Sequence, residues 1–300
     1  MERIFLMKII VACDGSQQSK KAIELLKQLP IPDAQFQLIN VAPVIEYDPE
    51  VIAKEAKEKI EAYNTDMLQK AKELLDDAKK LVEPDSKACE AKLIEGSPAE
   101  VLIEESKDAD LIVMGSRGLN PIKKIFLGSV SDALLRHAEC SVLLYKEAKE
   151  GEAVGDPLKV VVGYDDTPNS REACEFLKKF APNQLNSVDL LAVMQTHFYY
   201  GMNYSSTILE TWPKQKQVLE ESLEAMKREL ENQKASKNVG VTLKLDSYDV
   251  AHEINDFAKE ANAGLILVGS KGKNLIDRVF IGSVSNKLAH HGELPLLVVR

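Results

Sequence analysis

The feature that most constrains the fold is an internal repeat. The stretch VMGSRGLNPIKKIFLGSVS, residues 113–131, returns as LVGSKGKNLIDRVFIGSVS at residues 267–285, which is 154 residues later. The beginnings of the two halves also match, since KIIVACDGSQQSKKAIELLKQL from residue 8 parallels KVVVGYDDTPNSREACEFLKKF from residue 159. A chain of 300 residues is long enough to bury two cores, so the repeat predicts two copies of one domain.

Within each half, short apolar runs alternate with helical patterns. KIIVAC, FQLINVAPV, CEAKLIEG, DLIVMG and SVLLYK are the five runs of the first half, and the second half has a counterpart for each. Strands that are apolar almost throughout are typical of a parallel sheet covered on both faces. Because crossovers are short and right-handed, we expect an α/β fold with two doubly wound, five-stranded parallel sheets in tandem, each of strand order 3-2-1-4-5.

The segment between the halves, EAKEGEAVGDP, is polar and contains glycine. Such a composition is typical of a linker. We therefore predict a first domain over residues 1–146, a linker over residues 147–157, and a second domain over residues 158–300.

Charge and composition exclude several classes of partner. The formal net charge is −9, whereas proteins that bind nucleic acid or anionic membranes present a basic surface. No apolar run approaches the roughly 18–20 residues that span a bilayer, and the N-terminus lacks a secretory pattern. The four cysteines are isolated, as buried thiols in a reducing compartment are. We expect a cytoplasmic protein with neither nucleic acid nor membrane as a partner.

The glycines of the repeat fall at a particular place in the expected sheet. The crossovers after strands 1 and 4 leave in opposite directions, which opens a crevice between the carboxyl ends of those strands, where α/β proteins bind ligands. Asp14 and Gly115 end those two strands in the first half, and Asp165 and Gly269 do so in the second. The repeat therefore predicts one ligand site per half.

The chemistry of the motif favours an anion at that crevice. Gly115 and Gly118 lack side chains, so a ligand can approach the main chain closely. Gly128 and Ser129 open the fourth helix, whose free N–H groups and positive dipole end suit a phosphate, and the hydroxyls of Ser129 and Ser131 would add donors. Basic residues in the intervening arches supply countercharge: Arg117, Lys123 and Lys124, then Lys271, Lys273 and Arg278. A tight turn followed by the ordinary capping sequence SVSD is the alternative interpretation.

At this point the chain resembles a tandem universal stress protein, in which two domains of that family are fused. Both halves carry Gly-x2-Gly-x9-Gly-Ser, the signature of the family's nucleotide-binding branch, and the first half also has DGS and EGSPAEVL. The resemblance spans residues 8–300. It implies the adenine-nucleotide alpha hydrolase-like fold and binding of ATP, ADP or AMP, and it leaves open that Mg²⁺ arrives with the nucleotide.

The resemblance also implies a role for each matching position. Asp14 would contact adenine, Val41 would line the adenine pocket, and the glycines would run along ribose and phosphate. The implied nucleotide-binding residues of the first half are Asp14, Val41, Gly115, Gly118, Gly128, Ser129, Val130 and Ser131. Those of the second half are Asp165, Val193, Gly269, Gly272, Gly282, Ser283, Val284 and Ser285.

The second half departs from the family pattern in two places. Asp166 stands where a glycine is usual, and SYDVAHEI replaces the Gly-x-Pro element. An extra carboxylate near an anionic ligand is unfavourable. We therefore expect the first half to bind the nucleotide and the second half to bind it more weakly.

Three functions compete at this stage. The first is a nucleotide-binding, stress-response regulator that is not an enzyme. The second is a slow ATP hydrolase, although the chain lacks the G-x-x-x-x-G-K-[ST] motif and an obvious catalytic base. The third is a dimerisation scaffold with empty sites, since the fifth strands would lie at sheet edges. Family members commonly dimerise there, which implies an internal pseudo-dimer and leaves a homodimer open.

Overall fold

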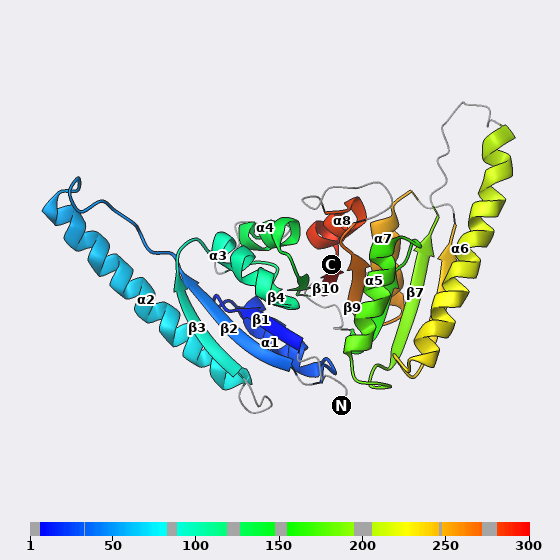
Figure 1. The fold of residues 1–300 in the computed structure, drawn as a ribbon, viewed down its shortest axis with the longest axis horizontal. Coiled ribbons are helices and arrows are strands. Elements are labelled where there is room, and N and C mark those ends of the chain that lie inside the picture. The colour runs from blue at the N-terminus through cyan, green and yellow to red at the C-terminus, as the bar shows by residue number, and fades with distance from the viewer. Residues whose placement is uncertain are drawn as a thin grey trace. The chain divides into compact units, whose positions relative to one another are not determined.

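The computed structural model describes residues 7–32, 34–82, 89–118, 127–147, 155–194, 206–245, 248–271 and 281–300. Contacts divide the described chain into two compact units, which contain strands β1–β5 and β6–β10 respectively (Figure 1). Among the described residues, no helix is long and apolar enough to cross a membrane.

The first unit is a five-stranded parallel sheet with the expected order, β3-β2-β1-β4-β5. Its strands and helices alternate along the chain as β1 Met7–Ala12, α1 Gln17–Gln28, β2 Ala34–Ala42, α2 Lys54–Val82, β3 Cys89–Glu95, α3 Pro98–Glu105, β4 Leu111–Gly115, α4 Ser129–His137 and β5 Ser141–Tyr145.

The second unit repeats this arrangement in the order β8-β7-β6-β9-β10, again with parallel pairs. Its elements are β6 Asp156–Gly163, α5 Pro168–Phe176, β7 Ser187–Val193, α6 Ser206–Asn232, β8 Val239–Lys244, α7 Val250–Glu260, β9 Ala263–Gly269, α8 Ser283–His291 and β10 Leu296–Val299. The prediction of two doubly wound parallel sheets with order 3-2-1-4-5 is confirmed.

The helices cover both faces of each sheet, as right-handed crossovers require. In the first unit α2 packs on β2 and β3, whereas α3 packs against α4; in the second, α6 packs on β7 and β8, and α7 against α8. Strands β4 and β9 are buried at every position, and three successive residues are buried in each of β1 and β6, namely Ile9–Val11 and Val160–Val162. Burial on both faces explains why these stretches are apolar at successive positions rather than at alternate ones.

Strand β6 begins at Asp156, inside the segment that its composition assigns to the linker. The main-chain N–H of Asp156 donates to the carbonyl of Asn262 at 3.0 Å, and Asp156 pairs with Ala263. Gly264 allows this approach, because a Cβ there would lie 2.6 Å from the main chain of Asp156 and Pro157. Asp156 and Pro157 therefore belong to a strand, although their polar surroundings in the sequence placed them in the predicted linker.

Candidate functional site

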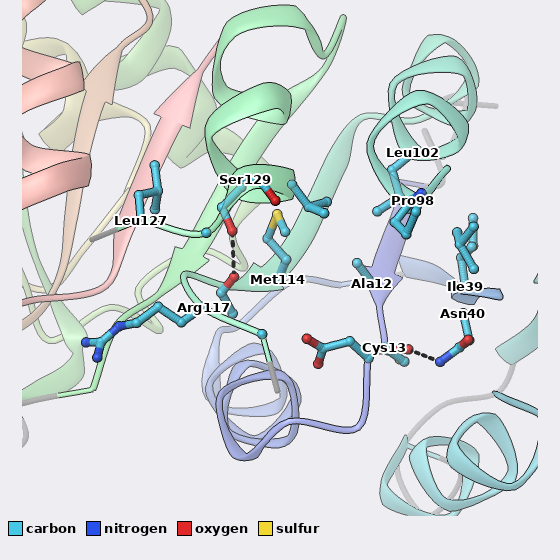
Figure 2. A pocket seen from close by; sticks show the side chains of 17 residues that line it. Ala12, Cys13, Ile39, Asn40, Pro98, Leu102, Met114, Arg117, Leu127 and Ser129 are labelled. Carbon is cyan, nitrogen blue, oxygen red and sulfur yellow. Dashed lines mark hydrogen bonds between the residues drawn. The ribbon is translucent and has the colours of Figure 1, made fainter. Parts of the chain in front are cut away.

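A cavity of about 660 Å³ opens in the first unit at the carboxyl ends of β1, β2 and β4 (Figure 2). The starts of α3 and α4 complete its wall. All eight site residues expected in the first half line it: Asp14, Val41, Gly115, Gly118, Gly128, Ser129, Val130 and Ser131. The structure thus brings these residues together at the crevice between strands 1 and 4.

Nine further residues line the same cavity: Ala12, Cys13, Ile39, Asn40, Pro98, Leu102, Met114, Arg117 and Leu127. Ala12, Ile39 and Met114 each lie one or two positions before a predicted site residue. Their places near the ends of predicted strands could therefore have identified them. Pro98 belongs to the EGSPAEVL motif. Asn40 carries a different signal, because it is a polar residue within an otherwise apolar strand.

One end of the cavity is apolar. Ala12, Ile39 and Met114 come from strand ends, and Pro98 and Leu102 come from the first two turns of α3. Figure 2 shows Ile39, Pro98 and Leu102 on one side of the view, while the guanidinium end of Arg117 extends away from them. Flat, apolar groups are buried favourably in such a pocket.

The other end consists mainly of main chain. Gly128 is the N-cap of α4, and no side chain caps the helix start through a hydrogen bond. Ser129, Val130 and Ser131 form the first turn. The first helical bond runs from the N–H of Asp132 to the carbonyl of Gly128 at 2.9 Å. Within the described residues, nothing accepts a hydrogen bond from the N–H groups of residues 129–131. These donors and the helix dipole make this end suitable for an anion.

Two hydrogen bonds fasten the start of α4 to the end of β4. The N–H of Gly128 donates to the carbonyl of Ser116 at 2.8 Å, and the hydroxyl of Ser131 donates to the carbonyl of Gly115 at 3.1 Å. The Ser131 hydroxyl is buried and donates within the protein, so we assign the role of hydroxyl donor to a phosphate to Ser129 and keep the N–H of Ser131 as a predicted donor. The exposed Ser129 keeps its hydroxyl at the cavity.

Gly115 has a packing role that the sequence analysis did not assign to it. A Cβ at Gly115 would lie 2.7 Å from the Cβ of Gln18 in α1 and 3.0 Å from that residue's main-chain carbon. The side-chain oxygen of Gln18 in turn accepts from the hydroxyl of Ser116 at 3.0 Å and the N–H of Arg117 at 2.9 Å. The missing side chain thus lets α1 approach β4 and fix the loop that follows.

The ionisable groups of the cavity are few. Asp14 accepts a hydrogen bond from the N–H of Ser16 at 2.9 Å, and a Cβ at Gly118 would lie 3.1 Å from its other carboxylate oxygen. Burial, followed by the charge of Asp14, raises the pKa of the Cys13 thiol to about 12, so this thiol is not a nucleophile near neutral pH. Among the described residues, no group of three or more His, Cys, Asp or Glu side chains is arranged to hold a metal ion.

The second unit reproduces the frame of the first. The N–H of Gly282 donates to the carbonyl of Ser270 at 2.7 Å, and the hydroxyl of Ser285 donates to the carbonyl of Gly269 at 2.7 Å. A Cβ at Gly269 would lie 2.5 Å from the main chain of Asn169, so this glycine also permits helix packing. Ser283 and Val284 occupy the first turn of α8, and Val193 ends β7. Gly272 lies outside the described residues, as do Lys123, Lys124, Lys273 and Arg278.

The strand ends of the second unit differ from those of the first. Asp165 accepts hydrogen bonds from the hydroxyl of Thr167 at 2.6 Å and from its N–H at 3.2 Å. Gly163 stands where the first unit has Ala12, and a Cβ there would lie within 3.1 Å of side-chain atoms of Ile254 and Val268. Apolar side chains of the second unit therefore lie close to the end of its first strand.

Asp166 occupies the turn that Gly15 forms in the first unit. Both residues have positive φ, 61° at Asp166 and 77° at Gly15. The Asp166 carboxylate accepts hydrogen bonds from the hydroxyl of Tyr164 at 3.0 Å and that of Ser222 in α6 at 2.6 Å, and it pairs with Arg171. Burial alone would raise the pKa of Asp166, but these hydrogen bonds and the guanidinium outweigh it and lower the pKa below 3.8.

Known proteins resemble this chain over nearly its whole length. A model of the Universal stress protein family matches residues 6–146 and again residues 158–300. A universal stress protein of Mycolicibacterium smegmatis is 27% identical over 303 residues, which cover 97% of this chain and 96% of that relative. Another, from Methanocaldococcus jannaschii, is 32% identical over 153 residues, or 48% of this chain and 84% of that relative.

A solved structure shares the fold over the same extent. The universal stress protein from Archaeoglobus fulgidus DSM 4304 superposes with a TM-score of 0.66 at 21% sequence identity, covering 98% of both chains. The tandem arrangement of two such domains is therefore found in another protein.

The packing role of Gly115 predicts a loss of stability on substitution. Gly115→Ala places a Cβ against Gln18, and we expect it to lower the free energy of unfolding by about 1–3 kcal/mol, as overpacking does. Denaturant unfolding of the full chain measures this. Gly115→Ala combined with Gln18→Ala is not expected to relieve the clash, because alanine keeps the Cβ at 2.7 Å and the main-chain carbon remains 3.0 Å away. Wild-type stability in Gly115→Ala would contradict the packing role.

The lowered pKa of Asp166 predicts a pH-dependent contribution to stability. Asp166→Asn keeps the shape and tolerates positive φ, but it loses the charge that pairs with the half-exposed Arg171. We expect it to cost about 1 kcal/mol at pH 7. Since the pKa is lowered on folding, the wild-type advantage is present above about pH 4 and disappears as the pH falls through the folded pKa. Urea midpoints at pH 7, 5 and 3 measure it; a difference between wild type and Asp166→Asn that does not shrink between pH 5 and pH 3 would contradict this assignment.

Proposed function

The chain belongs to the universal stress protein family, and from this premise we propose that it is a regulatory protein of the stress response that binds an adenine nucleotide in its first unit. The observation that carries the proposal is the cavity itself, which joins an apolar end at the strand termini to a main-chain, anion-binding end at α4. A nucleotide has the same division, with a flat base at one end and a phosphate tail at the other.

The size of the cavity is compatible with such a ligand. Its volume of about 660 Å³ lies within the roughly 300–1,000 Å³ of small-molecule sites. We propose that Asp14 and Val41 adjoin the base, that Gly115 and Gly118 run along ribose and phosphate, and that the first turn of α4 holds the phosphates. In that turn Ser129, Val130 and Ser131 would contribute N–H groups, and Ser129 also a hydroxyl.

Binding in the second unit is proposed as weaker. Its phosphate-binding frame, with Gly269, Gly282, Ser283, Val284 and Ser285, matches that of the first. The base end differs, because Asp165 already accepts two hydrogen bonds from Thr167. The repulsion expected from Asp166 is reduced, since Arg171 pairs with that carboxylate. The geometry at the strand ends, rather than the charge of Asp166, is the stronger reason to rank the second site below the first.

A regulator is favoured over an enzyme by the chemistry of the cavity walls. Among the described residues that line it, Asp14 is the one carboxylate and there is no histidine. In the proposed arrangement Asp14 lies at the base end, far from a terminal phosphate. Mg²⁺, where it is present, would be held mainly through phosphate oxygens and water, as is usual for this ion. Slow ATP hydrolysis and an empty scaffold remain the competing functions.

Substitution of Gly128 tests the proposal. In Gly128→Val the new side chain enters the space beside Ser116, Arg117 and Ser131, where a Cβ would make ordinary contacts of 3.4–3.7 Å. We expect the fold to persist while ATP affinity in the first unit falls at least tenfold, because the bulkier side chain intrudes on the space proposed for the phosphates at the start of α4. Calorimetric titration with ATP measures this, and Gly282→Val is the matched variant of the second unit.

Three measurements on the purified wild-type protein distinguish the competing functions. Adenine nucleotide released from the purified, denatured protein would support the proposal. Absence of released nucleotide, together with no thermal shift in millimolar ATP, would favour the scaffold. Conversion of ATP to ADP in single turnovers, lost in Gly128→Val, would favour the hydrolase.

A further inference from the structure

Asn40 is a buried polar residue to which the proposed function gives no role. Only 5% of it is exposed, and its neighbours Leu38, Ile39 and Ala42 in β2 are buried and apolar. It lines the cavity, and its side-chain amide donates a hydrogen bond to the main-chain carbonyl of Cys13, drawn as a dashed line in Figure 2. This bond joins the end of β1 to β2 through a side chain.

The pattern of the sheet shows which main-chain bond the Asn40 amide replaces. In parallel strands the N–H and C=O of one residue face the same neighbour, and successive residues face alternate neighbours. The N–H of Cys13 donates to the carbonyl of Ile39 at 2.8 Å, so Ile39 and Val41 face β1. The carbonyl of Ala42 accepts from the N–H of Gly96 at 3.0 Å, so Ala42 faces β3.

A regular ladder would continue with the N–H of Val41 donating to the carbonyl of Cys13. The Asn40 amide occupies that carbonyl instead, and no hydrogen bond joins Val41 to Cys13 within the described chain. The N–H and C=O of Val41 therefore face the space beyond the end of β1, and Val41 lines the cavity there.

We propose that Asn40 is a positioning residue for base selectivity: by holding the Cys13 carbonyl, it keeps the main chain of Val41 available to the edge of a bound base. This inference rests on the proposed function. A main-chain N–H beside a C=O offers one donor and one acceptor. Adenine presents an amino donor where guanine presents a carbonyl acceptor, so such a pair discriminates between the two bases.

The second unit offers an internal comparison. Its alignment with the first places Ala192 at the position of Asn40, and Ala192 is fully buried. The N–H of Tyr164 still donates to the carbonyl of Leu191 at 2.9 Å, as Cys13 does to Ile39. The second unit thus keeps the ladder bond but lacks a side chain that can hold the next carbonyl, and the selectivity assigned to Asn40 belongs to the first unit.

Two substitutions and three probes test the role of Asn40. Asn40→Leu keeps the branched shape and the number of side-chain heavy atoms but removes the donor. Asn40→Asp keeps the shape of the side chain, and its carboxylate cannot donate when it is ionised. Full-length protein is titrated calorimetrically with ATP, GTP and inorganic tripolyphosphate. We expect both variants to bind ATP about tenfold more weakly, with GTP and tripolyphosphate within twofold of wild type, so that the ATP-to-GTP preference falls by the same factor.

Asn64→Leu is the matched control. The Asn64 side chain also bonds to main chain, accepting from the N–H of Ile45 at 2.8 Å and donating to its carbonyl at 3.0 Å, but it lies outside the cavity lining. We expect its affinity for all three probes to stay within twofold of wild type. Circular dichroism checks the fold of each variant, and Asn40→Asp carries the test if Asn40→Leu does not fold.

The outcomes separate this inference from the proposed function. An unchanged ATP-to-GTP preference in a folded Asn40 variant overturns the role of Asn40 and leaves nucleotide binding intact. An equal loss for ATP, GTP and tripolyphosphate overturns it as well, since it indicates a purely structural effect. A wild-type protein that binds tripolyphosphate but neither nucleotide contradicts the proposed function, and the inference with it.

Discussion

The attachment of α4 to the end of β4 is the interaction on which the candidate site depends. The hydroxyl of Ser131 and the N–H of Gly128 both donate to carbonyls that follow the strand. These bonds aim the N–H groups of the helix start, which have no acceptor among the described residues, at the crevice between β1 and β4. Donors that are already in place lose little freedom when a ligand arrives. The same two bonds recur in the second unit, through Ser285 and Gly282.

The duplicated frame carries different strand ends, and the proposed difference in affinity between the two units rests on them. In the first unit Asn40 holds the carbonyl of Cys13 and the Val41 main chain faces the cavity. In the second unit Ala192 has no comparable group, and Asp166 is engaged by Tyr164, Ser222 and Arg171. The Asp166 cluster ties α6 to the turn after β6, whereas in the first unit Leu74 of α2 packs against the smaller Gly15.

Much of this could be predicted from the sequence because the repeat and the apolar runs depend on local periodicity and on general rules of sheet topology. Strand order and the gathering of Asp14, Gly115 and Gly128 followed from those rules. The roles of individual groups did not, since they depend on neighbours distant in the chain. The packing of Gly115 on Gln18, the inward hydroxyl of Ser131 and the bond from Asn40 to Cys13 all required three-dimensional contacts. Polar residues in buried strands are the signal that sequence reasoning passed over.

The most direct measurement of the central claim follows the amide signals of α4 in ¹⁵N-labelled full-length protein. If main-chain N–H groups at the helix start bind the phosphate tail, the signals of Ser129, Val130 and Ser131 shift on addition of ATP and shift much less with adenosine, which lacks phosphates. Saturating ATP that leaves these three amides unmoved while other signals shift would contradict the account.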